Sequence, residues 1–181
     1  MEDQNQPFKN LYLIGFMGVG KSHFGRIVSE TLNFQFFDTD HVIENNKQTS
    51  IAEIFKQRGE EVFRKLERDL IESGLPAEGC VIACGGGLAT QEGMMDLLKS
   101  KGVVIALFAS KETILERTSR NKNRPLLNVD NPEERIGEMM DERTPIYLGA
   151  DASIYTDDRT ITDIMHHIIR TYKTINKVKS S

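Results

Sequence analysis

Eight residues near the N-terminus, from Gly15 to Ser22, restrict the fold of this 181-residue chain more than any other stretch. Their sequence, GFMGVGKS, follows an apolar run and fits the pattern of a glycine, four residues, a second glycine, lysine and serine. Glycines let the backbone turn sharply and bring N–H groups close to an anion, and the positive end of a following helix adds to the attraction. The stretch therefore predicts a strand, a phosphate-binding loop and a helix in succession.

Within this loop, Lys21 is expected to contact the β- and γ-phosphates of a nucleotide, and the hydroxyl of Ser22 to bind Mg²⁺. A glycine-rich turn without a ligand is the alternative, but a chance match to the pattern is rare and the flanking segments favour phosphate binding. GTPases, ATPase motors and small-molecule kinases all use such a loop. A convincing NKxD guanine signature is missing, and the chain is too short for most motor ATPases.

Beyond the loop, apolar runs alternate with amphipathic segments, which is typical of a parallel sheet covered by helices. Strands are expected at residues 11–14, 34–37, 81–83, 103–108 and 153–155. Helices are expected at residues 21–32, 40–46, 51–57, 60–73, 93–99, 111–120, 132–143 and 161–175. Pro145 is expected to end the helix before it, and the tail 176–181 to be frayed. The prediction is one α/β domain over residues 1–181.

Composition narrows the classes of protein to which the chain can belong. Its formal net charge of −4 argues against a non-specific nucleic-acid binder. The apolar stretch 102–109 is too short to cross a bilayer, and the polar N-terminus lacks the pattern of a signal peptide. No coiled-coil or strongly apolar interface segment stands out in the sequence. We therefore expect a cytoplasmic monomer without a nucleic-acid or membrane partner.

The two cysteines, Cys80 and Cys84, flank a predicted strand. Four residues of extended chain separate them by about 13 Å, which is too far for a disulfide. We expect both to be buried as small apolar side chains. The four histidines are scattered along the chain, so no zinc-type cluster of ligands is predicted.

Two carboxylates, Asp38 and Asp40, follow the second predicted strand in the stretch FFDTDHVIE. Ligands of open α/β sheets bind at the carboxyl ends of the strands, and two residues of extended chain would place both side chains on one side. One carboxylate could lie near Mg²⁺ and the other near hydroxyls of a substrate. The alternative for Asp40 is a helix N-cap, and the sequence leaves both interpretations open.

The stretch GEEVFRKLERDLIES predicts a helix in which Val62, Leu66 and Leu70 form the buried stripe. Arg64 lies off this stripe and could pair with Glu67 one turn later, although a solvated charged face is the usual interpretation of such a run. Three further glycines, Gly85 to Gly87, follow the third predicted strand. They predict either a tight turn or a close approach of backbone to a ligand.

A polar, basic segment between residues 119 and 131 is long for a loop in a compact domain, and such loops are often lids. It carries Arg124 in the stretch NRPLL, and Arg143 follows in the stretch DERTPIY. Isolated arginines are mostly surface residues, so the interest of these two depends on the rest of the pattern.

The chain resembles the shikimate kinase family at this point. GFMGVGKS, DTD, FRKLE, GGG, RPLL and ERTPIY occur in the order and approximate spacing of that family, over nearly the full chain. Cys84 stands where the family varies, and residues 157–160 match less clearly, which leaves the adenine-side residues open. The resemblance implies a three-layer P-loop kinase fold with a five-stranded parallel sheet of strand order 2-3-1-4-5. It also implies ATP-dependent phosphorylation of shikimate at its 3-hydroxyl, with Mg²⁺ as cofactor.

By the same resemblance, Arg64 and Arg143 bind the carboxylate of shikimate, which suits the fork of a guanidinium. Glu67 orients Arg64, and Asp38 orders Mg²⁺ through water together with Ser22. The implied catalytic residues are Lys21, Asp40 and Arg124. The implied acceptor-binding residues, within a region at about 40–70 and beyond it, are Asp40, Arg64, Gly85, Gly86, Gly87 and Arg143. The expected ATP-binding residues are Gly15, Met17, Gly18, Val19, Gly20, Lys21, Ser22, His23, Arg117 and Arg124, the last on a lid at about 119–130.

Two other functions fit parts of the pattern. Another small P-loop kinase, acting on gluconate or a nucleoside monophosphate, would share the phosphate loop, but the DTD and GGG groups favour a hydroxylated acceptor. A non-catalytic nucleotide-binding module would have no need for Asp40, Arg64 and Arg143 together.

Overall fold

Five parallel strands form one sheet in the order β2-β3-β1-β4-β5. The computed structural model describes residues 9–119 and 131–180. Within these residues the strands are β1 (Asn10–Ile14), β2 (Gln35–Asp38), β3 (Cys80–Ala83), β4 (Gly102–Phe108) and β5 (Ala152–Tyr155). The fold and strand order implied by the family resemblance are confirmed.

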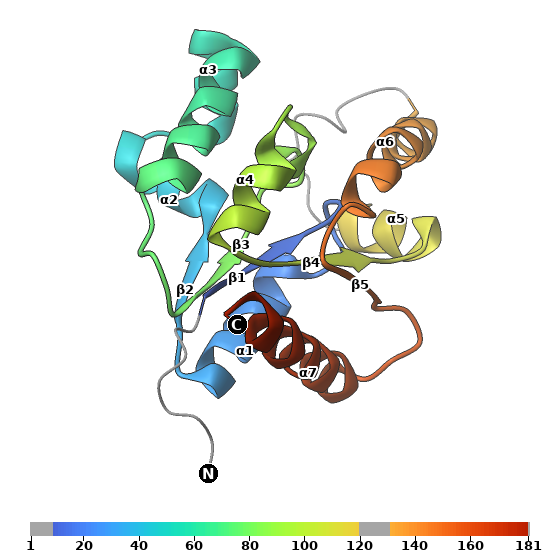
Figure 1. Cartoon of the computed structure of the whole chain (residues 1–181). Helices are drawn as coiled ribbons and strands as arrows, with labels where there is room; N and C mark the ends of the chain where they lie inside the picture. The colour runs from blue at the N-terminus through green and yellow to red at the C-terminus, as the bar shows by residue number, and fades with distance from the viewer. Residues whose placement is uncertain (1–8, 120–130, 181) are drawn as a thin grey trace.

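Helices cover both faces of this sheet (Figure 1). They are α1 (Lys21–Leu32), α2 (Thr39–Lys47), α3 (Ile51–Ser73), α4 (Met94–Lys101), α5 (Lys111–Ser119), α6 (Pro132–Tyr147) and α7 (Ile161–Lys179), with a short 3₁₀ helix, η1 (Leu88–Thr90). In the view of Figure 1, α1 and α7 lie below the sheet, α4 and α6 lie above it, and α2 and α3 extend beyond the β2 edge. The result is a parallel sheet covered by helices, as the alternating pattern predicts, in the three-layer arrangement that the family resemblance implies.

The central strand β1 fixes where the functional segments meet. It pairs with β3 through Leu13 and Ala83 and with β4 through Leu13 and Ile105, and all five of its residues are buried. On the far side of β3, Asp38 at the end of β2 lies in register with Ala83. Because the strands are parallel, the segments that follow β1, β2 and β3 emerge side by side at one edge of the sheet.

A second, smaller apolar core joins α2 to α3 away from the main core. Its buried members are Ile43, Ile54, Phe63 and Leu70. Val62, predicted to be in the core, is instead 36% exposed. The buried stripe of this helix passes one residue further along, through Phe63, and it includes the fully buried Glu67.

Two backbone features of the helices bear on the sequence predictions. Gly59 has non-helical dihedral angles, φ 81 and ψ 168, inside α3, so the break between the predicted helices 51–57 and 60–73 is confirmed. The prediction that Pro145 ends its helix is wrong, because α6 continues to Tyr147. Proline removes one backbone donor, but the amide of Leu148 still bonds to the carbonyl of Thr144 across it.

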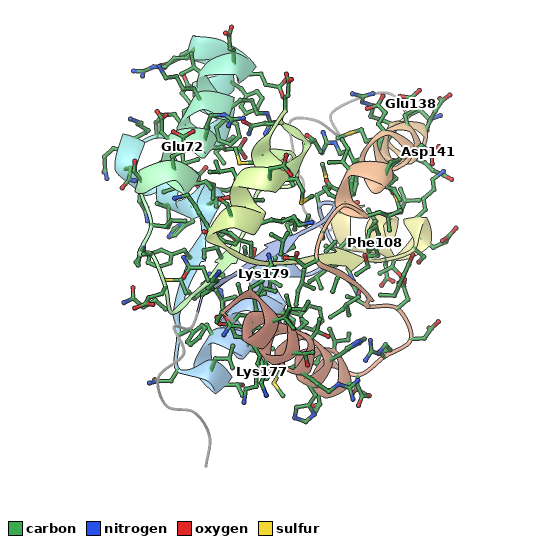
Figure 2. All side chains as sticks on the ribbon, in the orientation of Figure 1. Glu72, Phe108, Glu138, Asp141, Lys177 and Lys179 are labelled. Carbon is green, nitrogen blue, oxygen red and sulfur yellow. The ribbon has the colours of Figure 1, made fainter. Side chains whose placement is uncertain are left out.

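The C-terminal helix is anchored rather than frayed, so the expectation for residues 176–179 is wrong. Nζ of Lys179, at the end of α7 (Figure 2), donates hydrogen bonds to the carbonyls of Lys99 at 3.1 Å and Gly102 at 2.8 Å, and to Oδ2 of Asp151 at 2.7 Å. Asn176 is buried and accepts the backbone N–H of Lys9 at 3.1 Å. Short-range periodicity in a sequence cannot reveal such contacts, because they join residues that are far apart in the chain.

The remaining sequence expectations concern cysteines and membrane segments. Cys80 and Cys84 are both buried and free, as predicted. Among the described residues, no helix combines the length and the apolar character needed to cross a bilayer.

The contacts of Lys179 generate a stability prediction. Lys179→Met removes the ammonium that satisfies two carbonyls and a carboxylate, so the free energy of unfolding should fall by about 1–3 kcal/mol. Urea denaturation measures the difference, and Lys173→Met, an exposed lysine on the same helix, is the matched control. Equal stability of the two variants would contradict the anchoring role.

Candidate active site

The phosphate-binding loop connects β1 to α1 as predicted. Gly15, Gly18 and Gly20 all have positive φ angles, which lets the loop fold around the first residue of the helix. That residue, Lys21, is only 9% exposed, and its Nζ donates hydrogen bonds to the carbonyls of Gly15 at 2.8 Å and Phe16 at 2.9 Å. The loop thus holds an ammonium group among its own carbonyls, next to the positive end of a helix.

A cavity of about 240 Å³ lies in front of this loop. Ser22 and Asp38 face it together, and the hydroxyl of Ser22 donates a 2.5 Å hydrogen bond to Oδ2 of Asp38. The full lining is Met17, Gly18, Gly20, Lys21, Ser22, His23, Asp38, Asp40, Cys84, Gly85 and Gly86. The cavity combines backbone donors, a lysine and an oxygen pair, which is the chemistry that suits a phosphate with a divalent cation.

Asp38, and not Asp40, caps helix α2. Its Oδ1 accepts the backbone N–H groups of Asp40 at 3.2 Å and His41 at 3.4 Å, so the N-cap interpretation of Asp40 is wrong. The strand runs one residue further than expected and the helix begins at Thr39, which moves the cap to Asp38. Asp40 stands in the first turn of the helix, and its side chain is released for another role.

The side chain of Asp40 is half-buried, and its Oδ1 atom is fully buried and short of partners. Its Oδ1 has no hydrogen-bond partner in the described part of the chain. Burial, reinforced by the charge of Asp38 and opposed by Lys21, raises the pKa of Asp40 to about 6. A carboxyl group with one free oxygen and a pKa close to neutral can accept a hydrogen bond or a proton from a bound hydroxyl.

A second cavity, of about 160 Å³, adjoins the first one. It is lined by Met17, Asp40, Ile51, Phe55, Phe63, Arg64, Glu67, Gly85, Gly86, Gly87 and Arg143. The two cavities share four wall residues, Met17, Asp40, Gly85 and Gly86. A group bound in one cavity can therefore approach a group bound in the other across Asp40.

Arg64 and Glu67 form the ion pair that helical spacing made possible. Nη1 of Arg64 lies 2.7 Å from Oε2 of Glu67, which also accepts a 2.8 Å hydrogen bond from Nε2 of Gln91. Glu67 is fully buried, and its other oxygen, Oε1, has no hydrogen-bond partner among the residues described. Burial raises the pKa of Glu67 to about 7, against the opposing charge of Arg64. Sequence reasoning missed Gln91, since nothing local distinguishes it from a surface glutamine.

The glycine turn makes room for these side chains. A Cβ atom at Gly85 would lie 2.5 Å from Oδ1 of Asp40 and 2.8 Å from Oε1 of Glu67. A Cβ atom at Gly87 would lie 2.6 Å from Nη2 of Arg64. The turn that follows the third strand can therefore approach both carboxylates and the guanidinium only because its glycines lack side chains.

Helix α6 supplies the second arginine of the cavity. Nη1 of Arg143 donates a 3.4 Å hydrogen bond to the carbonyl of Gly86, and its guanidinium lies 5.8 Å from the ring centre of Phe16. Both contacts are with neutral groups, which leaves the charge of Arg143 available to an anion. The hydroxyl of Tyr147 also bonds to the carbonyl of Gly86. Tyr147 was missed in the sequence, although its place four residues after Arg143 sets both on one face of the helix.

The other residues that were predicted to bind the nucleotide lie in different surroundings. His23 is exposed at the rim of the first cavity, and Nη1 of Arg117 bonds to the carbonyl of Gly18 at 3.2 Å. Val19 is fully buried, so only its backbone can face a ligand. Arg124 and the expected lid lie outside the described residues, apart from the end of α5.

In the stretch where the resemblance is less clear, Asp157 ties two loops together. Its carboxylate accepts the backbone N–H of Ser110 at 2.7 Å and the hydroxyl of Thr113 at 2.7 Å. These contacts join the loop after β5 to the start of α5. Sequence reasoning left this segment unassigned, because Asp157 lies 47 residues after Ser110 and 44 residues after Thr113.

The close approach at Gly85 generates a prediction. Gly85→Ala should lower the free energy of unfolding by about 1–3 kcal/mol, because the methyl group would overlap two buried carboxylates. Gly86→Ala is the matched control, since a Cβ atom there would lie no nearer than 3.5 Å to the backbone of Met17. Thermal or urea denaturation of the ligand-free proteins makes the comparison. If both substitutions were tolerated equally, the glycine turn would not be set by these side chains.

Comparison with known proteins shows the family to which the chain is similar. The family model of shikimate kinase matches residues 17–173. A shikimate kinase from Caldanaerobacter subterraneus subsp. tengcongensis is 44% identical over 164 residues, which cover 91% of this chain and 96% of that relative. One from Thermodesulfovibrio yellowstonii is 42% identical over 172 residues, covering 95% and 99%.

Among solved structures, a shikimate kinase from Acinetobacter baumannii in complex with shikimate is similar at 36% identity and a TM-score of 0.87, covering 93% of this chain and 94% of that chain. Both the sequence and the fold of the chain thus match those of shikimate kinases. The chain belongs to the shikimate kinase family.

Proposed function

We propose that this protein transfers the γ-phosphoryl group of ATP to the 3-hydroxyl of shikimate, yielding shikimate 3-phosphate and ADP in the route to aromatic amino acids. One observation carries the proposal: Asp40 lines both the cavity in front of the phosphate loop and the cavity that holds Arg64 and Arg143. Phosphoryl transfer depends chiefly on the positioning of the two substrates and on the stabilisation of charge. A residue that lines both cavities can align the two substrates where the cavities meet.

On the donor side, Lys21 and the loop amides bind the β- and γ-phosphates. Ser22 and Asp38 would hold Mg²⁺, with Asp38 acting through water, and their paired oxygen atoms fit the few protein ligands that Mg²⁺ takes in nucleotide sites. When bound, the ion neutralises charge on the phosphate oxygens. To contact phosphate, the ammonium of Lys21 exchanges loop carbonyls for phosphate oxygens, which are stronger acceptors.

On the acceptor side, shikimate offers one carboxylate and three hydroxyls. Arg64 and Arg143 line one cavity from different helices and suit the carboxylate. The free Oδ1 of Asp40 suits a hydroxyl at the boundary with the phosphate cavity. In the transfer, Asp40 holds the 3-hydroxyl in line with the γ-phosphate and accepts its proton as the new P–O bond forms.

The proposal extends to the regions of the chain, to its location in the cell and to its oligomeric state. The smaller core of α2 and α3 supports a distinct acceptor-binding region at about 40–70 within a single kinase domain. The substrates are small molecules, in keeping with two small cavities. We further propose a cytoplasmic monomer without a nucleic-acid or membrane partner, and the net charge of −4 supports the first of these exclusions.

An acceptor panel tests this function. ATP consumption should depend on shikimate, whereas gluconate and AMP should give no more than the background rate of the enzyme with ATP alone. A coupled assay for ADP measures all four conditions with one enzyme preparation. Turnover with gluconate or AMP in place of shikimate would assign the chain to another small-molecule kinase, and ATP binding without turnover on any of them would indicate a binding module.

The role of Asp40 gives a second prediction. Asp40→Asn keeps the shape of the side chain but removes its charge, so turnover with shikimate should fall by about a hundredfold or more. Because Asp38 caps the helix, the free energy of unfolding should not decrease. Steady-state kinetics and denaturation of the same preparation give both quantities. A fully active Asp40→Asn enzyme would remove Asp40 from the chemistry.

A further inference from the structure

Arg64 is surrounded by carboxylates of its own helix. Besides the Nη1 contact with Glu67, Nε and Nη2 both donate to Oε1 of Glu60, at 3.1 Å and 2.7 Å. The side facing the glycine turn is covered by backbone, since a Cβ atom at Gly87 would lie 2.6 Å from Nη2. Each of the three guanidinium nitrogens therefore already donates to a carboxylate.

A third carboxylate cannot simply be added to this arrangement. Glu60 and Glu67 both oppose an acidic substrate at Arg64, because each ionised carboxylate adds negative charge beside the single positive charge of the guanidinium. A bidentate contact also needs two adjacent N–H groups on one edge of the guanidinium. Glu60 takes the edge formed by Nε and Nη2, so the carboxylate of an acidic substrate gains that edge, and meets less repulsion, when one of the two glutamates releases Arg64.

The environments of the two glutamates decide which one leaves. Glu67 is 0% exposed and is held by Gln91 as well as Arg64, so releasing it would strand a buried charge. Glu60 is 58% exposed, and water can solvate its carboxylate as soon as it leaves Arg64. An exposed ion pair at i,i+4 spacing is weak and is easily exchanged.

The backbone explains why Glu60 stands in this place. The helix breaks at Gly59, and Glu60 is the first residue after the break. Its carboxylate thus reaches the guanidinium of Arg64 from one helical turn before it. The ring of Phe63 lies 5.4 Å from the guanidinium carbon, which restrains the plane of Arg64 while its partners exchange.

We propose that Glu60 is a positioning residue that occupies the place of the substrate's carboxylate on Arg64 and moves into solvent when the substrate binds. The inference rests on the proposed function, because it takes the acceptor to be a carboxylic acid. Before binding, Glu60 keeps Arg64 in its binding orientation. It also sets a threshold for binding, since a ligand must outcompete an intramolecular carboxylate and weakly bound simple anions cannot.

The test is the substitution Glu60→Gln, with Glu61→Gln as the matched control. Glu61 is the neighbouring exposed glutamate, so the control removes the same charge from the same turn. Glu60→Gln should tighten shikimate binding by about two- to fivefold and lower the KM for shikimate to match, with kcat changed by less than about twofold. Glu61→Gln should bind shikimate as the wild type does. Calorimetry and steady-state kinetics measure these values, and Glu60→Ala should act in the same direction.

A purely structural role for Glu60 predicts the opposite sign. If Glu60 only orders the helix, its loss weakens shikimate binding, and this result or an unchanged Kd would overturn the inference while wild-type turnover upheld the proposed function. An equal gain in shikimate affinity in both glutamine variants would also overturn it. The gain would then come from the loss of a negative charge in general and not from the release of Arg64. A wild-type protein that neither binds nor phosphorylates shikimate would overturn the proposed function and this inference together.

Discussion

The buried ion pair of Arg64 and Glu67 is the interaction around which the acceptor side is built. A carboxylate with no exposure is costly unless it is paired, and Arg64 and Gln91 both contact the same oxygen of Glu67. The pair lies beside a turn of glycines, because a side chain at Gly85 would collide with Glu67. The smaller core between α2 and α3 holds the helix that carries both charges. The glycines of the turn are thus a consequence of where this pair is placed.

The parallel sheet brings this acceptor side against a phosphate site. The phosphate loop follows β1, the two aspartates stand at the junction of β2 and α2, and the glycine turn follows β3, with β3 lying between the other two strands. Asp40 stands where the resulting cavities meet, with one buried oxygen left for a ligand. Arg64 and Arg143 bring positive charge to the lining of the acceptor cavity. We infer that anchoring the carboxylate of shikimate there directs its hydroxyl toward Asp40.

Much of this arrangement was predictable from local patterns. The order of strands and helices follows from periodicity, and the phosphate loop, the aspartates, the glycine turn and the pairing of Arg64 with Glu67 follow from short motifs. The failures have long-range or subtle causes. The stripe prediction put Val62 in the core because it counted only apolar residues, whereas the buried face includes a glutamate. Pro145 was expected to stop a helix that continues to Tyr147, since the backbone bond from Leu148 to Thr144 still forms across it. Lys179 anchors the C-terminus through groups 28 to 80 residues away.

Recognition of the substrate's carboxylate by Arg64 and Arg143 is tested most directly by calorimetric titration with shikimate and with its methyl ester. The two ligands share the ring and the hydroxyls and differ in the anionic charge. If the arginines anchor the carboxylate, the ester should bind at least about a hundredfold more weakly, as expected when charged pairs are left unmatched. Equal affinities for the acid and the ester would contradict this mode of recognition.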